Sequence, residues 1–247
     1  MNINTFSVKR LYEIKCKLFK PEMSTINRVI IGVHGFAGDK ESSMLEKLAA
    51  ELCPCGVALL CFDFPAHGSS PVAEDMLTVE NCKQDLCRVY EYAREEFPTA
   101  DIGFFATSFG GYITLQCAHA FPGCDLILRA PAVTMPVLLL DNVLCTTLDR
   151  FREVGVIQCG FERPIRLPYS FVEELQTQEN LNKKPIQQRI LIIHGDRDDI
   201  VPIEDIREFI ACHNTATLQV IVGADHRFKK PGEMEEILSH TKAFLSV

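Results

Sequence analysis

The sequence predicts a single α/β domain, built on a mostly parallel central sheet with helices on both faces. Three runs, at 28–33, 57–62 and 189–194, are almost wholly apolar, as expected for strands that are covered on both sides. Amphipathic helical segments separate such runs, and strands that alternate with helices form parallel sheets. A chain of 247 residues, 47% hydrophobic and 23% charged, fits one α/β domain over 1–247.

The elements in the first part of the chain follow this alternation. Apolar residues at every second position predict a half-buried strand over 12–18. Ser43 and Glu46 have the spacing of a capping box, which predicts that a helix over 43–52 begins there. Thr78 is placed to cap the long helix that follows the strand at 57–62.

The rest of the chain continues the pattern, apart from one long segment. Strands are expected at 102–106, 126–128 and 218–222, and helices at 112–120, 203–210 and 234–245. Residues of about 131–185 show no clean alternation, yet the segment is too long and too apolar for a simple loop. Its aromatic residues include Phe151, Phe161 and Phe171. We expect this segment to be a small inserted cap over the mouth of a site.

A serine between a short strand and a helix is the strongest functional signal. The strand at 102–106 breaks at Ser108, and glycine at Gly110 gives the small-x-Ser-x-Gly pattern of a nucleophile elbow. Ala106 stands where this turn usually has glycine, and one methyl group is a mild departure. Because the short pattern also occurs by chance, the interpretation needs an acid and a histidine at matching places.

The histidine partner of Ser108 is expected in a loop that follows a later strand. In open α/β sheets, ligands bind beyond the carboxyl ends of the strands. The chain order serine, acid, histidine leaves His213, His226 and His240 near the end of the chain. His213 precedes a strand and His240 lies in the closing helix. We therefore assign His226, which follows the strand expected at 218–222.

The acid is expected in the loop after the strand at 189–194. This loop contains Asp196, Asp198 and Asp199. We expect Asp196 to accept backbone N–H groups in its own turn, and Asp199 to face solvent or the following helix. Asp198 is therefore the preferred acid.

These residues together predict acyl transfer. His226 is expected to take the proton of Ser108 as the serine attacks an acyl carbon, while Asp198 holds the imidazole tautomer. The backbone N–H groups of Phe36 and Phe109 are expected to form an oxyanion hole. The first follows a glycine-containing loop, and the second opens a helix.

Composition excludes several other kinds of site. The net charge of −8 and the pI near 5.4 give no basic surface for nucleic acid. Residues 1–10 have no signal-peptide core and nothing approaches a membrane span, so the eleven scattered cysteines predict buried thiols in a cytoplasmic protein. Cys53 and Cys55 have no second pair or histidine cluster to complete a metal site. We expect neither a metal nor a cofactor.

With these residues placed, the chain resembles the α/β-hydrolase superfamily over nearly its whole length. Within it, the sequence is similar to bacterial cinnamoyl (feruloyl) esterases and to acylglycerol-lipase-like hydrolases. The resemblance rests on the elbow and on the segments HGFAG (34–38), DFPAHG (63–68), HGDRD (194–198) and GADH (223–226). LPYSF (167–171) also looks like part of the family's lid. The elbow departs from the family, which usually has Gly-His where this chain has Ala106 and Thr107.

The resemblance implies a serine carboxylic-ester hydrolase for small or medium esters, with hydroxycinnamates among them. Peptidases and thioesterases share this triad, so they stay open as alternatives. A peptidase needs an anchor for a peptide terminus, for which Glu173 and Glu174 are candidates, although a pair on an exposed helix explains them as well. A non-catalytic binding homologue is a third alternative. The expected partner is a small-molecule ester, and a homodimer is left open.

Overall fold

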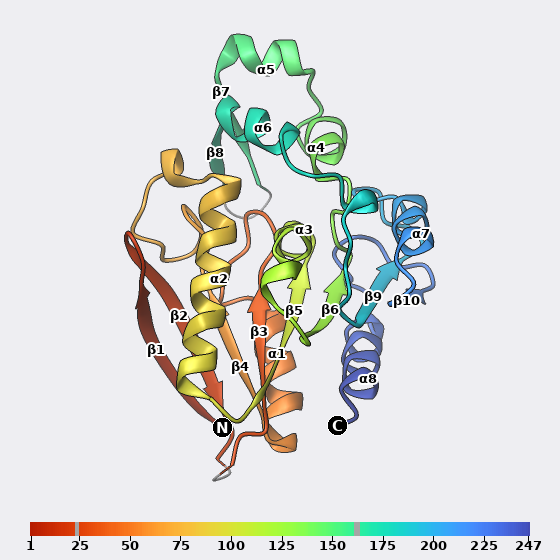
Figure 1. The fold of residues 1–247 in the computed structure, drawn as a ribbon. Helices are drawn as coiled ribbons and strands as arrows, with labels where there is room; N and C mark the ends of the chain where they lie inside the picture. The colour runs from red at the N-terminus through yellow and green to blue at the C-terminus, as the bar shows by residue number, and fades with distance from the viewer. Residues whose placement is uncertain (23–24, 161–163) are drawn as a thin grey trace.

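An eight-stranded sheet runs through the centre of the molecule (Figure 1). The computed structural model describes residues 1–22, 25–160 and 164–247. Pairs β1/β2 and β2/β4 are antiparallel, and every other neighbouring pair of this sheet is parallel. In spatial order the strands are β1 (Asn2–Lys9), β2 (Glu13–Lys20), β4 (Val57–Phe62), β3 (Arg28–Val33), β5 (Asp101–Thr107), β6 (Asp125–Arg129), β9 (Ile190–Gly195) and β10 (Ala216–Ile221).

Helices cover both faces of this sheet, as predicted. One face packs against α2 (Val79–Glu96), α3 (Phe109–Gln116) and α7 (Ile203–Cys212), and the other against α1 (Ser43–Leu52) and α8 (Glu233–Leu245). Strand β5 shows how the two cores are separated. Phe104 and Ala106 belong to the first core, whereas Phe105 belongs to the second, because successive side chains of a strand point to opposite faces. None of the described helices is long and apolar enough to span a membrane.

Three local expectations differ from the structure. The capping box is wrong: Ser42 is the N-cap of α1 without a side-chain bond, and the Glu46 carboxylate instead accepts from Lys17 Nζ at 3.1 Å. Strand β1 was not predicted; it pairs with β2 at the edge of the sheet, and Val8 is the one residue of the strand that is buried. Helix α3 begins at Phe109 and not at Tyr112, so both glycines of the elbow are helical.

The segment between β6 and β9 holds several short elements and lies beyond the carboxyl ends of the strands (Figure 1). We call residues 131–185 the insertion. Its elements are α4 (Met135–Leu138), a π-helical turn (Leu139–Val143), α5 (Leu148–Val154), the antiparallel strands β7 (Val156–Cys159) and β8 (Ile165–Pro168), and α6 (Tyr169–Gln176). Phe161, expected as one of its aromatic residues, lies outside the described residues.

One carboxylate of helix α6 bonds the insertion to the start of α2. Glu174 Oε2 and Oε1 accept the backbone N–H groups of Val79 and Glu80, both at 2.7 Å. The hydroxyl of Thr78 caps the next N–H group, as predicted. The first three N–H groups of α2, which have no acceptor within the helix, are therefore all satisfied.

Candidate active site

Ser108 occupies a strained turn between β5 and α3. Its φ of 49° and ψ of −115° are rare for a residue other than glycine, and such strain clusters at functional sites. The turn is held by its own backbone: the Ser108 N–H donates to the carbonyl of Arg129 at 3.0 Å, and its carbonyl accepts from Tyr112 and Ala132, each at 3.1 Å. The hydroxyl thus projects from a rigid support.

The space around the elbow explains its small residues. A Cβ on Gly110 would lie 2.4 Å from the His34 carbonyl oxygen and 2.7 Å from that of Val33, so the loop after β3 passes directly over this glycine. Ala106, in contrast, is fully buried in the core as the last inward residue of β5 before the turn. The methyl group in place of the usual glycine is therefore accommodated.

The structure brings Ser108, His226 and Asp198 together in one hydrogen-bonded chain. His226 Nε2 lies 3.0 Å from Ser108 Oγ, and its Nδ1 lies 2.7 Å from Asp198 Oδ2. The imidazole is 16% exposed, whereas the carboxylate is fully buried. Burial acts to raise the pKa of Asp198, but the hydrogen bond and charge of His226 outweigh it and hold this pKa below its usual value.

The residues not chosen as partners have other roles. Asp196 was expected to accept N–H groups of its own turn, but that prediction is wrong. Its Oδ1 accepts the backbone N–H of Gly223 at 2.6 Å and so connects the acid loop to the histidine loop. Asp199 is exposed, in agreement with the prediction. His213 Nε2 contacts the carbonyl of Leu181 at 2.9 Å. His213 precedes β10, so it lies at the amino end of that strand, whereas the triad lies at the carboxyl ends of the strands.

The two residues expected to form an oxyanion hole, Phe36 and Phe109, lie on separate elements next to Ser108. Phe109 is the first residue of α3, and the N–H groups at a helix start have no acceptor within the helix. In the loop after β3, the N–H of Ala37 donates to His67 Nε2 and that of Gly38 to the Gly35 carbonyl, so bonds of the two following residues hold the backbone next to Phe36. The rings of Phe36 and Phe109 meet edge to face at 5.6 Å.

Two buried histidines fix the loop that carries Phe36. His34 Nδ1 contacts the Gly35 carbonyl at 2.8 Å, and its Nε2 accepts the N–H of Phe64 at 3.1 Å. His67 has the same arrangement: Nδ1 contacts the Pro65 carbonyl at 2.8 Å, while Nε2 accepts from the loop. Burial lowers the pKa of His34, which keeps its ring neutral and its Nε2 free to accept.

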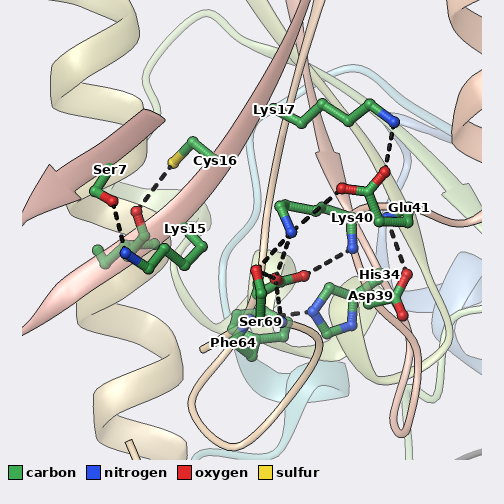
Figure 2. A network of polar contacts seen from close by, with 12 residues as sticks. Ser7, Lys15, Cys16, Lys17, His34, Asp39, Lys40, Glu41, Phe64 and Ser69 are labelled. Atoms are coloured by element: carbon green, nitrogen blue, oxygen red, sulfur yellow. Dashed lines mark hydrogen bonds and ion pairs between the residues drawn. The ribbon is translucent and has the colours of Figure 1, made fainter. Parts of the chain in front are cut away.

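A buried ion pair completes the support of this loop (Figure 2). Lys40 donates to Asp63 twice, from its backbone N–H at 2.8 Å and from Nζ at 2.9 Å, and Nζ also donates to Ser69 at 2.8 Å. Burial acts to raise the pKa of Asp63, but these bonds from Lys40 outweigh it and lower the pKa. Sequence reasoning missed Lys40, because nothing in its local pattern separates it from a surface lysine.

The triad opens into a pocket of about 810 Å³, a volume typical of small-molecule sites. Ser108, His226 and Arg129 all line this pocket. The insertion contributes apolar wall residues, among them Val143, Leu144 and Ile157. The loop of Phe36 also lines the pocket, from residue 34 to residue 38. A ligand bound here would touch both the triad and the insertion.

Comparison with known proteins places the chain in a family. The family model described as serine aminopeptidase, S33, matches residues 24–154, just over half of the chain. The chain belongs to this family of α/β hydrolases. The matched part of this chain contains Ser108 and the Phe36 loop, and it ends before Asp198 and His226.

Solved structures share the fold of this hydrolase over nearly its full length. Est1E from Butyrivibrio proteoclasticus, bound to ferulic acid, has a TM-score of 0.86 at 23% identity and covers 97% of both chains. Mouse alpha/beta hydrolase domain-containing protein 10 has a TM-score of 0.76 at 19% identity and covers 100% of this chain and 99% of its own. These likenesses confirm the predicted fold, and the family model confirms the predicted superfamily.

Curated relatives are longer than this chain. The human protein ABHD12B is 24% identical over 197 residues, which are 76% of this chain and 51% of the relative. An uncharacterized protein of Mycobacterium tuberculosis is 23% identical over 223 residues, 88% of this chain and 69% of the relative. This hydrolase therefore spans about half the length of the human relative.

Proposed function

We propose that this protein is a serine carboxylic-ester hydrolase that works through an acyl-enzyme on Ser108. The observation that carries the proposal is the hydrogen-bonded chain from Ser108 through His226 to Asp198, at 3.0 and 2.7 Å, on a pocket of about 810 Å³. Such a chain of nucleophile, base and orienting acid activates a serine at neutral pH. A non-catalytic homologue would have no need to retain all three groups together with a strained serine.

In the acylation step, Ser108 Oγ forms a bond to the carbonyl carbon of the ester and its proton passes to His226 Nε2. The carbonyl π electrons move onto oxygen, and this oxyanion accepts the N–H groups of Phe36 and Phe109. Asp198 holds the neutral imidazole in the tautomer with its proton on Nδ1, and it stabilises the imidazolium that then forms. The tetrahedral intermediate then breaks its bond to the alcohol oxygen, to which His226 returns the proton.

In the deacylation step, water replaces the alcohol. His226 takes a proton from the water as its oxygen bonds to the acyl carbon, and the same two N–H groups receive the second oxyanion. Collapse of this intermediate breaks the bond to Ser108 Oγ, and His226 returns the proton to the serine. The products are a carboxylic acid and the free enzyme, so neither a cofactor nor a metal enters the sequence of steps.

The insertion is proposed to act as the cap that selects the substrate. Its residues Val143, Leu144 and Ile157 give the pocket an apolar wall, which suits the acyl or alcohol part of a small or medium ester. Phe171 of α6 packs against both Phe36 and Phe109, at ring distances of 6.1 and 6.0 Å, so the cap also contacts the two residues proposed for the oxyanion hole. The likeness to ferulic-acid-bound Est1E supports hydroxycinnamates among the candidates.

A peptidase activity is the second candidate, because the family model carries that description. An aminopeptidase needs a carboxylate that is free to bind the peptide amine. Glu174 does not supply one, since both of its oxygens accept N–H groups at the start of α2. Glu173, the other member of that pair, is exposed on α6 and is not among the described residues that line the pocket. The ester therefore remains the favoured substrate.

The test compares kcat/KM for methyl ferulate, p-nitrophenyl butyrate, an aminoacyl p-nitroanilide and butyryl-coenzyme A, with Ser108→Ala as the blank. Ser108-dependent turnover that is fastest with one of the two esters supports the proposal. Preference for the ferulate would indicate an aromatic acid pocket under the cap, and preference for the butyrate a short-acyl esterase. Faster turnover of the anilide or the thioester would replace the ester hydrolase by a peptidase or a thioesterase.

A further inference from the structure

Arg129 is bonded to both sides of the proposed catalytic pair. It is the last residue of β6, and its carbonyl accepts the N–H of Ser108 at 3.0 Å. Its side chain reaches the histidine loop, where Nη2 donates to the carbonyls of Arg227 at 2.8 Å and His226 at 3.4 Å. One residue of the central sheet thus connects the nucleophile turn to the loop of the base.

The environment of the guanidinium is costly. Arg129 is only 9% exposed, and within the described part of the chain its side-chain hydrogen bonds go to backbone carbonyls and not to a carboxylate. The buried Nε has no partner among the residues that the structure describes. Burial lowers the pKa of Arg129 to about 10, although the charges of Asp198 and Asp225 oppose that shift. A buried cation that is only partly satisfied is unfavourable for stability, so a benefit to the site is the simpler explanation.

The ring of Phe228 further restricts the guanidinium, whose central carbon lies 4.7 Å from the ring centroid. Phe228 is 2% exposed and adopts a positive φ of 53°, directly after the histidine loop. The arginine is therefore held between this ring and two carbonyl oxygens. These contacts restrict the distance between β6 and the histidine loop. They also restrict the orientation of the His226 side chain.

We propose that Arg129 is a positioning residue that sets the distance between Ser108 and His226 through bonds to the backbone of each. The inference rests on the proposed function, because it assigns a part in the same reaction. Arg129 does not exchange a proton with the substrate. It limits the movement of the base relative to the nucleophile, and a misplacement of about 1 Å of a catalytic group can lower the rate about 100-fold.

The experiment compares Arg129→Met, Arg129→Lys and the matched control Arg189→Met. Methionine keeps an unbranched buried side chain but removes the charge and the donors, whereas lysine keeps the charge and one donor to the loop. Arg189 stands just before β9, donates to the Phe244 carbonyl at 3.2 Å and covers the Phe244 ring at 4.1 Å. Arg189 thus shares a carbonyl bond and a ring contact with Arg129, but it is 56% exposed and also pairs with Asp125. It lies at the opposite end of the sheet from the triad, so its removal reports the effect of losing an arginine away from the site.

The readouts are kcat and KM for the preferred ester, per active site titrated with a fluorophosphonate, together with the urea midpoint of unfolding. We expect Arg129→Met to lower kcat about 10- to 100-fold with KM within about twofold, because the donors that it loses are bonded to the histidine loop and the other residues that line the pocket are unchanged. Arg129→Lys is expected to recover part of kcat. Arg189→Met is expected to keep kcat within about twofold, even where its urea midpoint falls.

Four results would overturn the inference. An unchanged kcat per titrated site in Arg129→Met would leave a purely structural arginine, and an equal loss in Arg189→Met would indicate a general effect of destabilisation. A raised KM with unchanged kcat would make Arg129 a substrate contact. If the wild type hydrolyses no ester, the proposed function fails, and the rate at which the fluorophosphonate labels Ser108 still compares the variants. No labelling of the wild type would overturn both.

Discussion

Asp198 is held by both of its carboxylate oxygens, and one of them faces His226. Oδ2 lies 2.7 Å from His226 Nδ1, while Oδ1 accepts the backbone N–H groups of Ile200 and Val201 at 2.9 and 2.8 Å. The carboxylate therefore cannot rotate without losing backbone bonds. Because its pKa is lowered, it also stays ionised down to the acid range. Its orientation and its charge both favour an imidazole with the proton on Nδ1.

Asp198→Asn tests this relationship, because it keeps the shape of the side chain and removes the charge. The amide can present an N–H group to His226 and so favour the wrong tautomer. We expect kcat for the preferred ester to fall about 1,000- to 10,000-fold, as in other triads of this type. The control is Asp196→Asn, which retains an oxygen for the Gly223 N–H. Comparable kcat values for the two variants would contradict the assignment of the acid.

The Lys40–Asp63 pair predicts a pH dependence of stability. The pKa of Asp63 is lower in the folded protein than the value near 4 of an unfolded chain, so its contribution is present above that value. The contribution is lost as pH falls through the folded pKa. The difference in unfolding free energy between wild type and Asp63→Asn should be largest above about pH 5 and shrink toward pH 3. Urea unfolding at several pH values measures it, and a constant difference would refute the ion-pair account.

Glu174 predicts that the insertion is joined to α2 by a helix cap. Removing both acceptors in Glu174→Ala leaves the N–H groups of Val79 and Glu80 without their protein partner. We expect the unfolding free energy to fall by about 1 to 2 kcal/mol. Glu173→Ala, an exposed neighbour on the same helix, is the matched control and should change it by less than about 0.5 kcal/mol. Equal effects would show that the bonds of Glu174 to the start of α2 contribute nothing to the free energy of unfolding.

The elbow predicts opposite tolerance at its two small positions. Gly110→Ala would place a methyl group 2.4 Å from the His34 carbonyl oxygen, so backbone must move, at a cost of about 3 kcal/mol or more. Ala106→Gly restores the usual residue and should cost only about 1 kcal/mol. Chemical denaturation of both variants distinguishes them. A larger loss for Ala106→Gly would contradict the steric argument.

The sequence was informative where local pattern and function coincide. The elbow was visible in the sequence alone, as an apolar run followed by Ser108 and a glycine. The positions of Asp198 and His226 follow from the rule that ligands bind beyond the carboxyl ends of parallel strands. The triad residues chosen in this way lie within hydrogen-bond distance of one another. The elbow and these two loops were therefore predictable without coordinates.

The remaining features depend on partners that are distant in sequence. Glu46 leaves the expected capping box because Lys17 of β2 lies beside it, and Asp196 bonds to the loop of Gly223. Lys40 and Arg129 look like ordinary cations until the fold buries them. The interior of the insertion was not resolved by pattern, since strands such as β7 and β8 have four residues each, too few to display a period.

The most direct test of the account is covalent labelling of the nucleophile. Wild type, Ser108→Ala and His226→Ala are each treated with a fluorophosphonate, from which an activated serine displaces fluoride and becomes phosphonylated, and the modified peptide is identified by mass spectrometry. The account predicts one label on Ser108 in the wild type, no label in Ser108→Ala, and a labelling rate reduced at least about 100-fold in His226→Ala. A label on another residue, or equal rates with and without His226, would contradict it.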